Sequence, residues 1–113
     1  GLEDSYLPIP IAHGEGRASF KSSADTLHAL KNNLVPMQYT DNDLKVTEQY
    51  PFNPNGSPEG ITALTTPDGR ATIMMPHPER AFMPRQLSWL PDTLEENSPW
   101  LHLFINAREW IEN

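Results

Sequence analysis

The sequence predicts a small, loop-rich α/β domain or a part of a larger domain. Apolar residues recur at helical spacing in two stretches, and short stretches rich in β-formers lie between them. Proline is abundant, with 12 of 113 residues, whereas a typical domain contains about 5%. This content predicts much irregular backbone and a thin core. The length suits one domain, since domains commonly have about 100–150 residues.

The first half of the chain is expected to form one helix with short extended segments around it. Ser23 is a suitable N-cap, and leucines then recur at spacings of three and four, which predicts a helix over 24–33. Asn32-Asn33 would end this helix. The extended segments that we expect are residues 7–13, 17–20, 35–39 and 45–49.

The second half has the strongest strand signals and a closing helix. Ile61–Thr66 and Arg70–Met75 are predicted strands, joined by Pro67-Asp68-Gly69. Proline presets its own φ and glycine supplies the positive φ that such a turn needs, so these residues are a strong hairpin signal. Ser98 followed by Pro99 predicts the start of a closing amphipathic helix.

The composition excludes several classes of function. The chain has 8 Lys+Arg and 15 Asp+Glu, which gives a net charge of −7, whereas proteins that bind nucleic acid or anionic membranes need clustered basic residues. No apolar run approaches the ~20 residues of a membrane span, and the start lacks the pattern of a signal peptide, so we expect a cytoplasmic protein. The absence of cysteine excludes a disulfide, a thiolate metal site and a cysteine nucleophile in this chain.

Two short segments have the pattern His-x-Glu, and each follows an apolar stretch. They are His13-Gly14-Glu15 and His77-Pro78-Glu79. In extended backbone, residues i and i+2 point to the same side, so the carboxylate can accept from one ring nitrogen and leave the other free as a base. The second copy is the sharper candidate, because Pro76 and Pro78 restrict the backbone around His77 at the end of a predicted strand.

Each candidate also has a simpler interpretation. His77 can be a loop histidine beside a solvated glutamate, and His13-Gly14-Glu15-Gly16 can be a turn that needs positive φ. The two His-x-Glu pairs together could form a zinc or iron site, although the spacing suits histidine orientation better than joint ligation. Asn53-Pro54-Asn55-Gly56-Ser57 is either a structural loop or a polar ligand site, and composition does not decide between them.

Three motifs follow one another along the chain in a specific order. His13-Gly14-Glu15-Gly16-Arg17 comes first, Asn53–Ser57 second and Met74–Arg80 third. Together they resemble the glutaminase domain of the phosphoribosylformylglycinamidine synthases, a family of purine-biosynthesis enzymes. Ser98-Pro99-Trp100 and Asn106-Ala107-Arg108 look like the carboxyl end of the large, single-chain form of that family.

The resemblance implies a class I glutamine amidotransferase, in which a cysteine thiolate attacks the side-chain amide of glutamine. It implies that His77 is the catalytic histidine and that Glu79 orients it. His13, Gly14 and Glu15 match the stretch that lines the glutamine pocket. The ammonia would pass to a synthetase domain, where formylglycinamide ribonucleotide is converted to the amidine with ATP and magnesium. No cofactor is expected in this chain, and the intact enzyme would be a glutamine-dependent carbon–nitrogen ligase.

The missing cysteine is a departure from the pattern of this family. We therefore expect residues 1–113 to be the carboxyl-terminal part of the glutaminase domain, with an incomplete three-layer α/β/α sheet. Its partners would be the rest of that domain and the synthetase domain of the same polypeptide. The isolated chain is expected to be inactive, because a base and its orienting glutamate cannot form the thioester without a nucleophile. The alternative is a non-enzymatic binding module or pseudoenzyme that retains a remnant of the fold.

Overall fold

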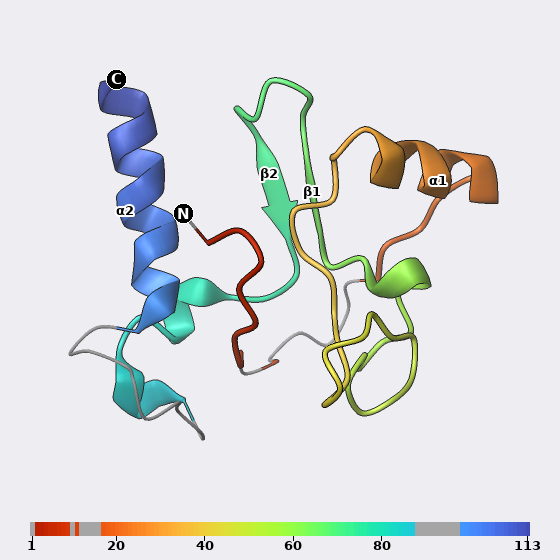
Figure 1. Cartoon of the computed structure of the whole chain (residues 1–113), viewed down its shortest axis with the longest axis horizontal. Coiled ribbons are helices and arrows are strands. Elements are labelled where there is room, and N and C mark those ends of the chain that lie inside the picture. Colours follow the sequence, from red (N-terminus) through yellow and green to blue (C-terminus); the bar gives the residue numbers. More distant parts are fainter. Residues whose placement is uncertain (1, 10, 12–16, 88–97) are drawn as a thin grey trace. The chain divides into compact units, whose positions relative to one another are not determined.

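The computed structural model of the chain describes residues 2–9, 11, 17–87 and 98–113 (Figure 1). The chain divides into two units, of which one comprises Gly1–Ala12 and Pro76–Asn113 and the other His13–Met75. Among the described residues, each unit contains one α-helix, and the single two-stranded sheet lies in His13–Met75. The described residues therefore form a small α/β structure, which agrees with the predicted class.

The first helix, α1 (Ser23–Lys31), lies close to the predicted range but begins earlier. Its N-cap is Ser22 and not Ser23, because Oγ of Ser22 accepts from the N–H of Asp25 at 3.3 Å. Ser22 is the serine that stands three residues before this N–H, which is the spacing that a capping side chain needs. The helix ends at Lys31 with Asn32 as its C-cap, and Asn33 follows with a positive φ of 56°. The predicted end at Asn32-Asn33 is therefore confirmed.

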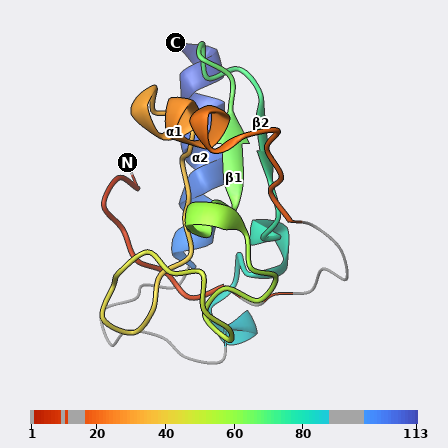
Figure 2. The same cartoon turned by 90° about the vertical axis from the view of Figure 1, so that its right-hand side faces the viewer.

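The two strands form the predicted hairpin (Figure 2). β1 (Ala63–Thr65) and β2 (Thr72–Met74) are antiparallel, with Leu64 opposite Ile73. In the turn, the N–H of Gly69 donates to the carbonyl of Thr66 at 2.9 Å, and Gly69 has a φ of +71°. The glycine thus supplies the positive φ that the sequence predicts, and the strands are shorter than expected.

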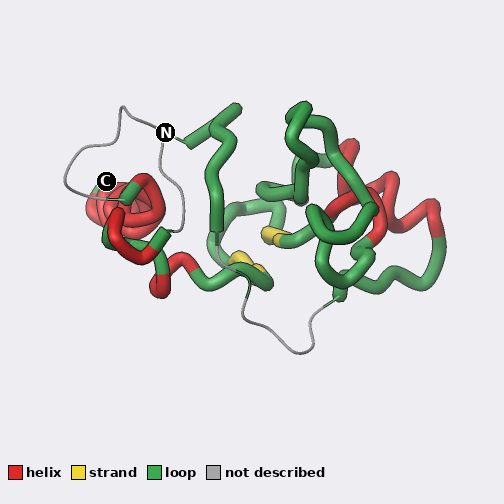
Figure 3. Tube along the Cα trace, turned by 90° about the horizontal axis from the view of Figure 1, so that it is seen from below, coloured by secondary structure: helices red, strands yellow, loops and turns green. Residues whose placement is uncertain are grey.

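The other predicted extended segments form no regular strand, which corrects that part of the prediction. Residues 7–9, 11 and 17–20 are irregular, and 35–39 and 45–49 contribute only isolated bridges. The chain after α1 nevertheless lies beside β1, where the N–H of Thr65 donates to the carbonyl of Leu34 at 2.9 Å. Pro36 has no N–H and so interrupts a regular ladder at this edge. Figure 3 shows that loops make up most of the trace, as the proline content predicts.

The second helix, α2 (Pro99–Glu112), begins where the sequence predicts. Ser98 is the N-cap, and its Oγ accepts from the N–H of Trp100 at 3.2 Å. α2 packs against η2 (Pro78–Arg80), a 3₁₀ turn that is followed by a second one, η3 (Pro84–Gln86). The buried residues of this unit include Pro76, Pro78, Ala81, Leu87 and Trp100. No helix in the described part of the chain is long and apolar enough to cross a membrane.

Candidate active site

His77 and Glu79 lie on a short turn that is anchored by two buried prolines. Pro76 is buried, and His77 has a φ of −111° and a ψ of 84° directly before η2. Pro78 is also buried, and the N–H of Arg80 donates to the carbonyl of His77 at 3.0 Å, which closes the turn. The side chains of His77 and Glu79 are nevertheless 39% and 59% exposed. The backbone of this turn is therefore fixed while both functional groups stay accessible.

The side chains of His77 and Glu79 contact each other as the His-x-Glu pattern predicts. Nδ1 of His77 lies 2.9 Å from Oε1 of Glu79. The backbone that brings them together is a 3₁₀ turn, which corrects the extended geometry expected from the sequence. The reason is Pro78, whose fixed φ suits the first position of a helical turn.

Electrostatics give this pair a defined protonation pattern. The pKa of Glu79 lies below its ordinary value of 4.5, first because its carboxylate accepts from its own backbone N–H and then because it accepts from His77. An ionised carboxylate can only accept hydrogen bonds, so the contact assigns the ring proton of His77 to Nδ1. The lone pair of Nε2 is then available to take up a proton. The pair can thus serve as a general base with an orienting carboxylate.

The predicted glutamine-pocket residues His13, Gly14 and Glu15 lie outside the described residues. Their role, and a metal site that would combine both His-x-Glu pairs, therefore stay predictions. Within residues 2–9, 11, 17–87 and 98–113, no group of three or more His, Asp or Glu side chains is arranged to hold a metal ion.

The Asn53–Ser57 loop uses its polar side chains internally. Asn53 and Ser57 are almost fully buried. Nδ2 of Asn53 donates to the carbonyls of Thr47 and Ser57, each at 3.0 Å, and its Oδ1 accepts from the N–H of Ser57 at 3.1 Å. Oγ of Ser57 donates to Oδ1 of Asn55 at 2.9 Å and accepts from the N–H of Ala18 at 3.3 Å. Buried polar groups that satisfy one another favour the structural interpretation of this loop.

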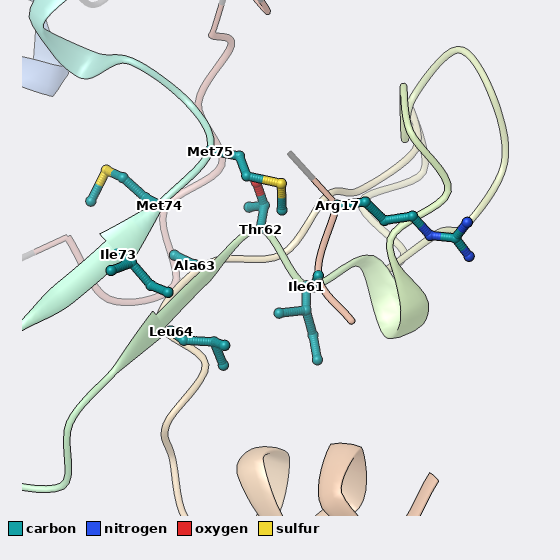
Figure 4. A pocket seen from close by; sticks show the side chains of 9 residues that line it. Arg17, Ile61, Thr62, Ala63, Leu64, Ile73, Met74 and Met75 are labelled. Atoms are coloured by element: carbon teal, nitrogen blue, oxygen red, sulfur yellow. The ribbon is translucent and has the colours of Figure 1, made fainter. Parts of the chain in front are cut away.

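An open hollow of about 170 Å³ lies beside the hairpin (Figure 4). Its lining is mainly apolar and comes from both strands and the residues next to them: Ile61, Ala63, Leu64, Ile73, Met74 and Met75. Arg17 also lines the hollow, but Figure 4 shows its guanidinium directed away from these side chains. The hollow thus offers apolar surface and no charged group that points into it.

One contact of α2 could not be predicted from the sequence. The apolar pattern indicates that Trp100, Phe104 and Trp110 are core residues. Burial confirms this for Trp100, whereas the prediction is wrong for Phe104 and Trp110, which are 43% and 57% exposed. The indole Nε1–H of Trp100 also donates to the carbonyl of Pro8 at 2.7 Å, across 92 positions of sequence. A backbone carbonyl carries no sequence signal, so only the structure identifies this acceptor.

A comparison with models of known protein families finds one family that matches almost the whole chain. A family model described as CobB/CobQ-like glutamine amidotransferase domain matches residues 1–111. The chain belongs to this family. Membership confirms the coarser part of the resemblance, a glutamine amidotransferase domain, and points to glutamine amidotransferase activity. The amidotransferase match includes both His-x-Glu segments, the Asn53–Ser57 loop and the start of α2.

Proposed function

We propose that this chain is the carboxyl-terminal part of the glutaminase domain of a large, single-chain phosphoribosylformylglycinamidine synthase. The observation that carries the proposal is the His77–Glu79 pair, whose 2.9 Å contact holds the imidazole in one tautomer with Nε2 free. The order of the motifs along the chain and its membership of the amidotransferase family support the same conclusion.

In the proposed reaction, a cysteine thiol supplied by the rest of the domain gives its proton to Nε2 of His77, and the resulting thiolate attacks the side-chain amide carbon of glutamine. His77 donates a proton to the leaving nitrogen, so ammonia departs and a thioester with the cysteine sulfur remains. His77 then takes a proton from water as the water attacks the thioester, which releases glutamate and restores the thiolate. Glu79 holds the ring in place and stabilises its protonated form.

The ammonia would then serve a synthetase domain outside this chain, where ATP and magnesium act. The product would be the amidine of formylglycinamide ribonucleotide. The residues of this chain contribute only to the release of ammonia from glutamine. The proposal therefore separates two measurable reactions of the intact enzyme, one that uses glutamine and one that uses free ammonia.

The exposed surface of the hairpin supports an incomplete sheet. Ile73 on β2 is 71% exposed, and the apolar hollow lies beside the same two strands. β2 also has no second strand partner among the described residues, and an unpaired edge strand is where a further strand of the sheet would add. A pseudoenzyme or binding module would instead need no cysteine at all, so a cysteine-dependent activity of the full-length polypeptide distinguishes the two.

The test of the proposed function is His77→Ala in the full-length polypeptide. We expect glutamine-dependent activity to fall by about 10²–10⁴-fold, the usual contribution of a general acid–base, while ammonia-dependent activity stays unchanged. His102→Ala, which removes an exposed histidine from α2, is the matched control and should leave both activities unchanged. An equal loss of both activities in His77→Ala would refute the assignment.

A further inference from the structure

Trp100 joins α2 to the amino-terminal segment of the same unit. The ring is 6% exposed, and it is the buried residue of α2. Its Nε1–H donates to the carbonyl of Pro8 at 2.7 Å. Burial of the ring needs no N–H group, whereas a buried indole N–H requires an acceptor. The contact with Pro8 therefore adds a directional link to a packing interaction.

The same end of α2 is linked to the turn that bears His77 and Glu79. α2 packs against η2, and the N–H of Ser98 donates to the carbonyl of Phe82 at 3.2 Å. Ser98 is fully buried, as is Ala81 directly after η2. The start of α2 thus has the amino-terminal segment attached through Trp100 and the η2 turn attached through packing and a backbone hydrogen bond.

We propose that Trp100 is a positioning residue for the His77–Glu79 pair, an inference that rests on the proposed function. The bond from Nε1 to Pro8 fixes the start of α2, and α2 fixes η2. The contact between His77 and Glu79 spans only two residues, so it persists without Trp100. What Trp100 controls is where the pair lies relative to a bound glutamine. Displacement of a catalytic group by about 1 Å can cost about 100-fold in rate.

The direct test is Trp100→Phe in the full-length polypeptide, with hydrogen exchange as the readout. Phenylalanine retains an aromatic ring and loses the donor to Pro8. A hydrogen bond of ordinary strength corresponds to about a fivefold change in a local opening equilibrium. We expect the amides of Arg80 and Ala81, which bond within this turn at 3.0 Å each, to exchange about fivefold faster. The hairpin amide of Thr66 should be unaffected.

The kinetic test compares Trp100→Phe with Trp110→Phe, which changes an exposed tryptophan on the same helix. We expect Trp100→Phe to lower glutamine-dependent kcat about fivefold or more, with ammonia-dependent activity unchanged. Trp110→Phe should match the parent protein in both assays. A purely structural role for Trp100 would lower both activities of the polypeptide together, and that result would overturn the inference.

Comparison with His77→Ala separates a failure of the proposed function from a failure of the role of Trp100. If His77→Ala retains glutamine use, the proposed function fails. If His77→Ala loses it while Trp100→Phe behaves like Trp110→Phe, only the role of Trp100 fails. Should Trp100→Phe lower the melting temperature, benzothienylalanine at position 100 keeps the bicyclic shape and replaces the N–H by sulfur. The same fivefold criteria then apply to that variant.

Discussion

The ionised carboxylate of Glu79 is the acceptor for the Nδ1–H of His77, so the charge of Glu79 controls this hydrogen bond. Its pKa lies below 4.5 because the carboxylate accepts from its own backbone N–H and from His77. A lowered pKa means that the folded state holds this proton less tightly than the unfolded chain. The pairing is therefore fully present above pH 4.5 and is lost as the pH falls through the lower pKa of the folded state. Carbon NMR of the Glu79 carboxyl should give a titration midpoint below 4.5.

Two variants separate the causes of the lowered Glu79 pKa. His77→Ala should raise the midpoint but leave it below 4.5, because the backbone N–H is the larger cause and remains. Arg80→Ala removes only the smallest charge effect on Glu79 and should raise the midpoint less. A midpoint no higher in His77→Ala than in Arg80→Ala would contradict the hydrogen bond between His77 and Glu79.

Among the elements, two glycines with positive φ test how the loops hold the hairpin. Gly69 has a φ of +71° and open space around it, whereas a Cβ at Gly60, with a φ of +64°, would lie 3.0 Å from the carbonyl oxygen of Tyr39. Gly69→Ala should lower the free energy of unfolding by about 1–2 kcal/mol, which is the penalty for an L-residue in this backbone region. Gly60→Ala should lower the free energy of unfolding by about 1–3 kcal/mol more than Gly69→Ala does, because the neighbouring backbone must also move.

Urea unfolding of the two alanine variants measures this difference. The penalty for positive φ is common to both, so the difference between their free energies of unfolding isolates the steric contact at Gly60. Equal destabilisation would mean that the Tyr39 carbonyl can move away without cost, and the close packing around Gly60 would then be wrong.

The sequence predicts those elements whose signals lie within a few residues. The hairpin turn depends on Gly69, and the start of α2 depends on Ser98 and the proline after it. The sequence does not determine the start of α1, because Ser22 and Ser23 are both suitable N-caps. Only the structure shows that Ser22 accepts from the N–H of Asp25. The prediction of strands on either side of α1 is wrong, because a strand needs a partner distant in sequence and no local pattern specifies where that partner lies.

The candidate site follows the same rule. The contact between His77 and Glu79 is predictable since its two side chains are two residues apart. The bond from Trp100 to Pro8 spans 92 positions and ends on a backbone carbonyl, so no pattern of residue types reveals it. The Asn53–Ser57 loop lies between these cases, because its composition indicates a turn but only burial shows where its amides are used.

At the scale of the whole molecule, the sheet of the described residues is a single two-stranded hairpin. A two-stranded hairpin is marginal by itself and needs further strands or a helix against it. β1 has the chain after α1 along its other side, whereas β2 has no second strand partner among the described residues. An edge strand has unpaired backbone N–H and C=O groups that can pair with another strand. Ile73 on β2 is 71% exposed, so its apolar side chain is free to pack against added structure. Under the proposed function, the added strand comes from the cysteine-bearing part of the domain.

The last prediction concerns reconstitution of the glutaminase from two pieces. We expect this chain alone to have no glutaminase activity and a mixture with the cysteine-bearing part to regain it. Ile73→Glu should lower the regained activity at least about tenfold, because a carboxylate would be buried where the new strand packs. Tyr50→Glu introduces the same charge at a loop residue that is 80% exposed and should not affect recovery. Activity of the chain alone, or equal recovery with both variants, would show that the sheet needs no such strand.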